Sequence, residues 1–175
     1  MDRKSVWLIA LGLILILGLV TACGTPVTGL SEDDETAIYT AVIRQLYESS
    51  RPANFPITYL VRTTDDNVGV PSAPRSESRR LGPKIQRDIP VRLKELPTQL
   101  VWTDSTDAVQ LDSSGKVENG GAIITFGNAH LQEDGSVLVS ARLYAAPDIT
   151  TNKTYLVEQL NGVWQIVGDK SNNNE

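Results

Sequence analysis

His130 is the one histidine in the chain, and histidine is the side chain whose ordinary pKa lies closest to neutral pH. A general base for hydrolysis or isomerisation would therefore be this residue, paired with a carboxylate. Aspartates that fit by type are Asp65, Asp104 and Asp107, which lie in polar turns. Nothing in the sequence fixes the distance from any of them to His130. The competing interpretation is a surface histidine or one at the rim of a hairpin. The sequence therefore assigns no catalytic residue.

Metal and cofactor sites have little support in the sequence. A zinc site takes several histidine or cysteine ligands, and this chain has one of each. Segments 104–107 and 112–115 carry oxygen ligands that calcium accepts, but they lack the alternating acids and closing glutamate of a calcium loop. Neither a glycine-rich phosphate loop nor a Gly-x-Ser-x-Gly motif occurs. We expect no metal and no cofactor.

Basic residues gather in the middle of the chain, where seven of the 16 lysines and arginines lie between Arg75 and Lys94. One interpretation is a contact for an anionic partner, because bases near a membrane gain about 1 kcal/mol each from anionic lipid. The other is a solvated, flexible loop whose charges keep the chain soluble. The candidate anionic contact consists of Arg75, Arg79, Arg80, Lys84 and Arg87.

Cys23 is the only cysteine, and it follows an apolar run from Val6 to Val20 that is preceded by Arg3 and Lys4. A basic start, a short apolar run and small residues before a cleavage point are the parts of a secretory signal peptide. With Cys23 used at that point, the rest of the chain has neither disulfides nor thiol chemistry.

The residues Val20, Thr21, Ala22 and Cys23 resemble the lipobox of bacterial lipoproteins. The resemblance implies that residues 1–22 are removed as a signal peptide and that Cys23 carries the lipid, such as palmitate, as the new N-terminus. An uncleaved transmembrane helix is the alternative, because about 20 apolar residues can span a bilayer. Either way we expect a domain outside the cytoplasm, held at the cell membrane or the outer membrane.

The remaining chain is long enough for one domain. Residues 23–30 contain Gly, Thr and Pro and are predicted to be a flexible tether, residues 31–170 a single domain, and residues 171–175 a polar tail. The chain has 21 acidic against 16 basic residues, a net charge of −5. This balance argues against nucleic acid as a partner, since phosphates require a basic surface.

Periodicity predicts an α+β fold. An amphipathic helix begins at the N-cap Ser31 and carries apolar residues three and four apart as far as Tyr47. A second, short helix is predicted to begin with Asp88 as its cap and Pro90 in its first turn. Segment 63–83 has no apolar period and is predicted to be a long loop. Strands are predicted at 55–62, 100–102, 122–131, 137–145, 154–160 and 163–167.

Asn161-Gly162 between the last two strands is a strong hairpin signal. We therefore expect an N-terminal amphipathic helix packed on a curved antiparallel sheet that ends in a β-meander. This order of elements is similar to the nuclear-transport-factor-like and cystatin-like folds. Such folds include both enzymes and binding modules, so the similarity implies no particular chemistry.

These features together predict a membrane-tethered extracytoplasmic lipoprotein with a non-catalytic binding or accessory role in the cell envelope. Its partners would be the membrane, through the lipid on Cys23, and an envelope protein, a polymer or a small ligand. The alternative is an envelope hydrolase or isomerase that uses His130 with an aspartate in a sheet-lined pocket. A third hypothesis is a passive structural lipoprotein.

The anchor can be tested by intact mass. Protein extracted from membranes is expected to begin at residue 23 and to carry added acyl mass, because the lipobox directs cleavage and lipidation. The Cys23→Ser variant is expected to lose that mass. An unacylated chain that still contains Met1 would contradict the lipoprotein assignment and favour the transmembrane helix.

Overall fold

The computed structural model describes residues 29–50 and 54–171. Within them, the chain first forms helix α2 (Glu32–Ser49). The Ser31 hydroxyl accepts the N–H of Asp34, and the Asp34 carboxylate accepts the N–H of Ser31, which forms a capping box. Four acidic residues in the first turn favour the positive end of the helix dipole. The lipobox residues 20–23, the tether up to residue 28 and most of the polar tail lie outside the described residues.

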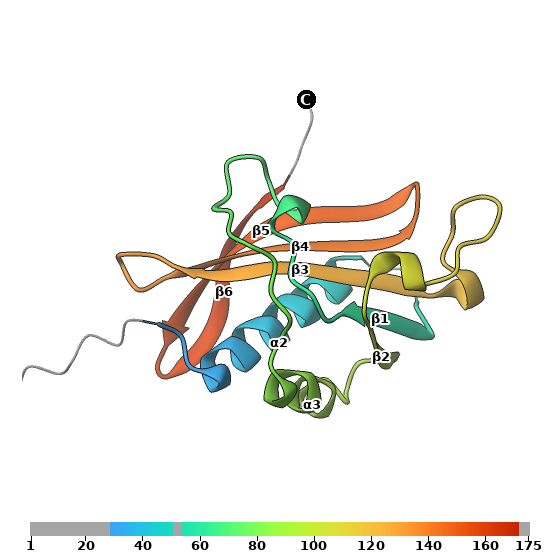
Figure 1. Cartoon of the computed structure of the whole chain (residues 1–175). Coiled ribbons are helices and arrows are strands. Elements are labelled where there is room, and N and C mark those ends of the chain that lie inside the picture. The colour runs from blue at the N-terminus through green and yellow to red at the C-terminus, as the bar shows by residue number, and fades with distance from the viewer. Residues whose placement is uncertain (1–28, 51–53, 172–175) are drawn as a thin grey trace, which may run out of the picture.

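The sheet has six strands in the order β2-β1-β3-β4-β5-β6 (Figure 1). With α2 and α3, it confirms the α+β class. The strands are β1 (Ile57–Val61), β2 (Gln99–Thr103), β3 (Ala122–Leu131), β4 (Val137–Ala146), β5 (Ile149–Leu160) and β6 (Val163–Ser171).

The prediction of a wholly antiparallel sheet is wrong, because β1 is parallel to both of its neighbours, β2 and β3. The remaining pairs, from β3 to β6, are antiparallel. Parallel neighbours need a crossover connection. Helix α3 supplies it between β1 and β2, and residues 104–121 lead from β2 to β3.

The second helix also differs from its prediction, since α3 spans Pro83–Arg92 and contains Pro90 inside it. Pro83 lies in the first turn, where the missing N–H costs nothing. Pro90 has no N–H for the carbonyl of Gln86, four residues earlier. Trp102 on β2 supplies the missing donor, because its indole Nε1 donates to the Gln86 carbonyl at 2.7 Å. A side chain from the sheet therefore makes proline possible within the helix.

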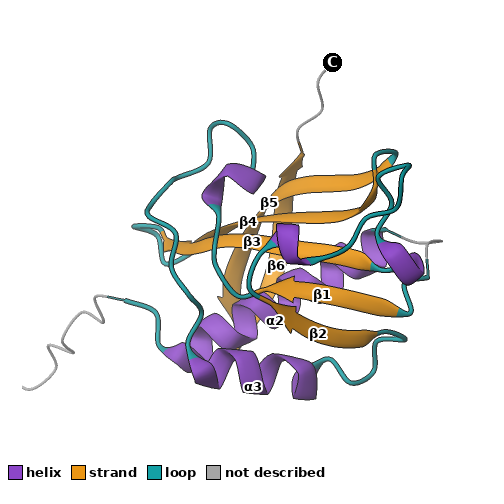
Figure 2. Cartoon of the chain, turned by 45° about the vertical axis from the view of Figure 1, so that its right-hand side comes forward, coloured by secondary structure: helices purple, strands orange, loops and turns teal. Residues whose placement is uncertain are grey.

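The two faces of the sheet are covered differently (Figure 2). Helices α2 and α3 pack on one face over the main core, which includes Leu60, Ile124, Phe126 and Leu143. The opposite face has a smaller core of Val61, Val109, Val117 and Ile123. Two irregular segments lie over that face: residues 62–76 with the short helix η1 (Asp66–Val68), and residues 104–121 with η2 (Thr106–Ala108) and η3 (Glu118–Gly120).

The segment predicted as a long loop is packed against the sheet. Val68, Val70 and Leu81 are buried, and Thr63 forms a β-bridge with Arg80. Its buried residues show that it is not a solvated loop along its whole length. The predicted loop is confirmed in that η1 is its only helix or strand before α3 begins at Pro83, but the sequence did not indicate that the loop is packed, because its apolar residues follow no regular period.

The role of Trp102 can be tested by a double-mutant cycle with Pro90. Trp102→Phe is expected to lower the free energy of unfolding by about 1–3 kcal/mol, since the Gln86 carbonyl loses its donor. Pro90→Ala restores a backbone N–H, so it should stabilise the Trp102→Phe protein more than the wild type. Denaturant unfolding of the four proteins measures this difference. If the changes in unfolding free energy from the two substitutions were simply additive, Trp102 would not be replacing the N–H donor that Pro90 lacks.

Candidate functional site

A β-bulge in β3 organises the face opposite the helices. Between Phe126 and Ala129 the register with β4 shifts, which leaves backbone groups without partners in the ladder. The Phe126 carbonyl accepts the N–H of Asp65 at 2.8 Å, and the Gly127 carbonyl accepts the Tyr39 hydroxyl at 3.1 Å. A side chain at Gly127 would collide with the carboxylate of Asp66, so this position requires glycine.

The carboxylate of Asp66 is buried beside this bulge and is only 4% exposed. Its Oδ1 accepts the N–H of Asn128 at 2.7 Å. Its Oδ2 accepts the N–H of Ser76 at 2.8 Å and Nδ2 of Asn128 at 3.1 Å, and lies 3.0 Å from Nε2 of His130. Burial acts to raise the pKa of Asp66, but the hydrogen bonds from Asn128, Ser76 and His130 outweigh it and hold the pKa below its usual value.

Asn128 extends the network to the helical layer. Its Oδ1 accepts the Thr64 hydroxyl at 3.0 Å and Nε of Arg79 at 3.1 Å. Arg79 also pairs with Glu35 of α2 at 2.6 Å. Segment 62–82 is thus joined to the β3 bulge and to α2 by polar contacts that the sequence alone did not indicate.

His130 is paired with Asp66, which is none of the three aspartates proposed as its partners. Asp66 already accepts several structural hydrogen bonds, and His130 is not among the residues that line the pocket described below. Asp65 and Asp107 do line that pocket, but without a histidine. The geometry therefore does not assemble the expected histidine–aspartate pair in a cavity. The His130–Asp66 contact stabilises the fold of β3.

The five basic residues of the candidate anionic contact are mostly paired within the chain. Arg79 pairs with Glu35 and Arg80 pairs with Asp104. Within or beside α3, Lys84 contacts Asp33 and Asp88, and Arg87 contacts Asp88. Arg75 is exposed and makes no ion pair with the described residues. These side chains consequently form no single unpaired basic surface.

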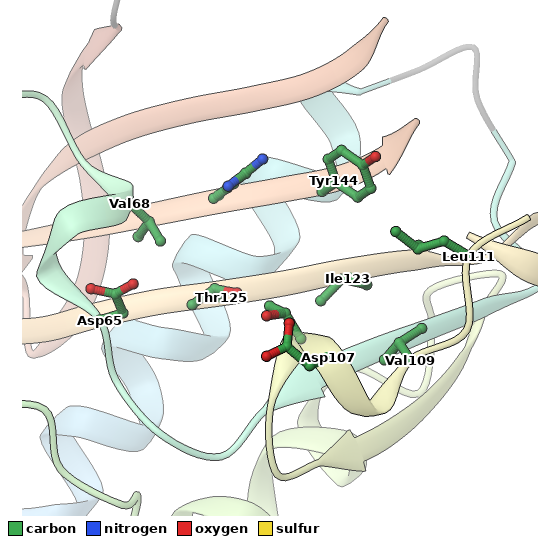
Figure 3. Close-up of a pocket in the computed structure, with 10 residues that line it drawn as sticks. Asp65, Val68, Asp107, Val109, Leu111, Ile123, Thr125 and Tyr144 are labelled. Carbon is green, nitrogen blue, oxygen red and sulfur yellow. The ribbon is translucent and has the colours of Figure 1, made fainter. Parts of the chain in front are cut away.

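A pocket of about 470 Å³ opens on the sheet face between the two covering segments. Figure 3 shows its labelled residues on three sides. One wall comes from the η1 segment, the other from η2 and the residues after it, and the floor from β3 and β4. Its volume is typical of a small-molecule site. The walls carry Asp65 and Val68 on one side and Asp107, Val109 and Leu111 on the other.

Ion pairs to Asp104 hold the two walls together. Arg62 at the end of β1 contacts Asp104 at 3.0 Å, and Arg80 contacts the same carboxylate oxygen at 3.1 Å. Both arginines hold the pKa of Asp104 below its usual value, with the hydrogen bond from Arg62 as the largest cause. The pocket is therefore formed between segments that are fixed to each other as well as to the sheet.

Arg142 lies on the floor of the pocket and is its only cation. Its Nε is buried and makes no hydrogen bond with the described residues. Directly across from it on β5, Oδ1 of Asn152 is also buried and unpaired, so these two groups are the nearest complement to each other in the strand register. Arg142 lies directly across from Thr125 in the β3–β4 register, and its guanidinium is 5.3 Å from the centroid of the Tyr144 ring. The sequence analysis missed Arg142. The sequence feature that could have indicated it is a single charged residue in a strand of alternating apolar and mixed residues, two positions before Tyr144 on the same face.

Within the described parts of the chain, no group of three or more His, Cys, Asp or Glu residues is placed to hold a metal ion. None of the helices described there has the length and apolar character needed to cross a membrane. The chain gives no match to a known protein family, to a curated protein or to a solved structure.

The Asp66 network predicts acid-dependent stability. Asp66→Asn is expected to lower the free energy of unfolding at pH 7 by about 3 kcal/mol, because an amide places donors against the donors of Ser76 and Asn128. Since the folded pKa of Asp66 is lowered, its contribution is complete above the ordinary aspartate value of about 3.9 and is lost as the pH falls below it.

Denaturant unfolding between pH 7 and pH 2.5 measures this effect. The difference between wild type and Asp66→Asn should shrink in the acid range. Asp107→Asn is the matched control, since Asp107 is exposed and should leave stability nearly unchanged. An Asp66→Asn protein as stable as the wild type at pH 7 would contradict the structural role of the network.

Proposed function

We propose that this protein is a lipid-tethered extracytoplasmic binding domain whose pocket on the open sheet face takes a small ligand. The observation that carries the proposal is the concave pocket of about 470 Å³, whose floor carries the guanidinium of Arg142 without an ion-pair partner among the described residues. An anionic group of a ligand would pair with this guanidinium. The lining does contain carboxylates and hydroxyls, on Asp65, Asp107, Thr106 and Thr125. None of these side chains is hydrogen-bonded to another as a nucleophile and its base, so the proposal is binding and not catalysis.

The proposed tether comes from the lipobox resemblance, with Cys23 as the lipidated residue and the cell envelope as the location. Helix α2 begins at Glu32, and Leu30 packs against the main core. A tether of residues 23–30 would extend at most about 25 Å from the anchor. Figure 1 shows the chain leading into α2 on one side of the molecule and the η2 segment on the other. The pocket opening would then be accessible to a ligand outside the membrane.

The finer architecture belongs to the same proposal: an N-terminal amphipathic helix on a curved sheet that ends in a β-meander, with one domain over residues 31–170. The candidate anionic contact is a further part of the proposal. Arg75 is its best candidate residue, since the other four members pair with carboxylates of the chain.

The binding function can be tested by thermal unfolding of the full chain extracted in non-ionic detergent. A panel of small organic anions, cations, zwitterions and neutral compounds is added to the wild type and to Leu111→Trp. Leu111 is 46% exposed on the pocket wall, so a larger ring there should obstruct the pocket without disturbing the core. At least one class should raise the unfolding temperature of the wild type but not of this variant.

Val163→Trp is the control, because Val163 is 57% exposed on β6 and does not line this pocket. It should respond to the panel as the wild type does. If no compound class stabilised the wild type, or if Leu111→Trp responded equally, the binding proposal would fail and a passive structural lipoprotein would be favoured.

A further inference from the structure

The pocket contains charges of both signs that do not neutralise each other directly. Arg142 is on the floor, and the walls carry Asp65 and Asp107. No carboxylate of the described residues lies within ion-pair distance of the Arg142 guanidinium. The two aspartates therefore remain available at the opening while the guanidinium remains available at the floor.

The hydrogen bonds of the two aspartates leave acceptor capacity free. Oδ1 of Asp65 accepts the backbone and side-chain N–H groups of Asn67 at 2.9 and 2.8 Å, whereas its Oδ2 accepts none from the described residues. Asp107 is exposed on η2 and accepts no hydrogen bond from those residues. Ionised carboxylates of this kind attract ammonium groups.

This charge pattern discriminates among simple ligands. A simple anion bound to Arg142 would lie in the same pocket as two carboxylates, and a simple cation bound to the carboxylates would face the guanidinium; like charges brought together in this way cost binding energy. A ligand with one anionic and one cationic group avoids both repulsions. The pocket therefore favours a zwitterion over either single charge.

The remaining lining is apolar. Val109 and Ile123 are buried, and Leu111 is a large side chain that stays 46% exposed at the edge. The Tyr144 hydroxyl donates to the carbonyl of Gly115 at 2.6 Å, so its ring is held in place beside the guanidinium. An apolar ligand side chain that covered Leu111 would gain binding energy from the area removed from water.

We propose that the pocket binds an apolar amino acid or a short apolar peptide with a free amine and a free carboxylate. Arg142 receives the carboxylate, Asp65 and Asp107 receive the ammonium group, and the apolar side chains lie against Val109, Leu111 and Ile123. A volume of about 470 Å³ leaves room for more than a single small ion. This inference rests on the proposed function, because it names the ligand class of the same pocket.

Four probes with one apolar body test the inference: leucyl-leucine, N-acetyl-leucyl-leucine, leucyl-leucinamide and N-acetyl-leucyl-leucinamide. Their affinities for the detergent-extracted full chain are measured by calorimetry. The free dipeptide should bind best. Each blocked form should bind at least about tenfold more weakly, because one ionic contact is lost.

Two variants assign the contacts. Arg142→Gln should remove the preference for a free carboxylate, so that leucyl-leucine and leucyl-leucinamide bind equally weakly. Asp107→Asn should reduce the preference for a free amine. Arg92→Gln is the matched control, because Arg92 is exposed and does not line this pocket, and it should keep the wild-type order of affinities.

The outcomes separate the inference from the proposed function. If N-acetyl-leucyl-leucine bound as tightly as the free dipeptide, the pocket would be an anion site and the inference would be overturned. The inference would also be overturned if none of the four probes bound while another compound class stabilised the wild type but not Leu111→Trp; the binding function would then stand. If neither experiment detected binding, both would fail.

Discussion

The hydrogen bonds between the carboxylate of Asp66 and the β3 bulge are the interaction on which the open face of the sheet depends. The bulge frees the N–H of Asn128, and Asp66 accepts it together with groups from Ser76 and the side chain of Asn128. A bulge without such partners would leave backbone groups buried and unpaired. The carboxylate therefore satisfies the bulge and fixes segment 62–82 to the sheet. Gly127 is required at the same point, since any side chain there would displace Asp66.

The pocket follows from this attachment. Asp65 precedes the anchored Asp66, and Val68 ends the short helix that Asp66 begins, so both are placed on the pocket wall by residues that are themselves buried or hydrogen-bonded. The opposite wall is connected through Asp104, which pairs with Arg62 and Arg80 of segment 62–82. The pocket walls are thus supported by polar contacts to well-packed elements, an arrangement that favours a preformed binding site.

Asp66 and Arg142 illustrate the difference between a structural and a ligand-directed charge. Both lie close to β3 on the same face of the sheet. Every hydrogen bond of Asp66 is made within the protein, which leaves it little capacity for chemistry with a substrate. The guanidinium of Arg142 lines the pocket and makes no ion pair with the described residues, so its charge remains available to a ligand. His130 belongs with Asp66 in the first group, although its residue type first drew attention to catalysis.

The sequence by itself determined the features that depend on neighbouring residues: the α+β class, the N-cap at Ser31, and the turn chemistry at Asn161-Gly162, where Asn161 and Gly162 both have positive φ. The lipobox is likewise a local pattern, and it remains a prediction. Tertiary structure decided the parallel pairing of β1, the start of α3 at Pro83, the partner of His130 and the position of Arg142 in a pocket. Each of these depends on residues far apart in the chain: Trp102 makes Pro90 acceptable, and Asp66 meets Asn128 across 62 positions. Hydrogen bonds between such distant residues leave no periodic trace in the sequence, because they need only one donor and one acceptor brought together by the packing of the whole domain.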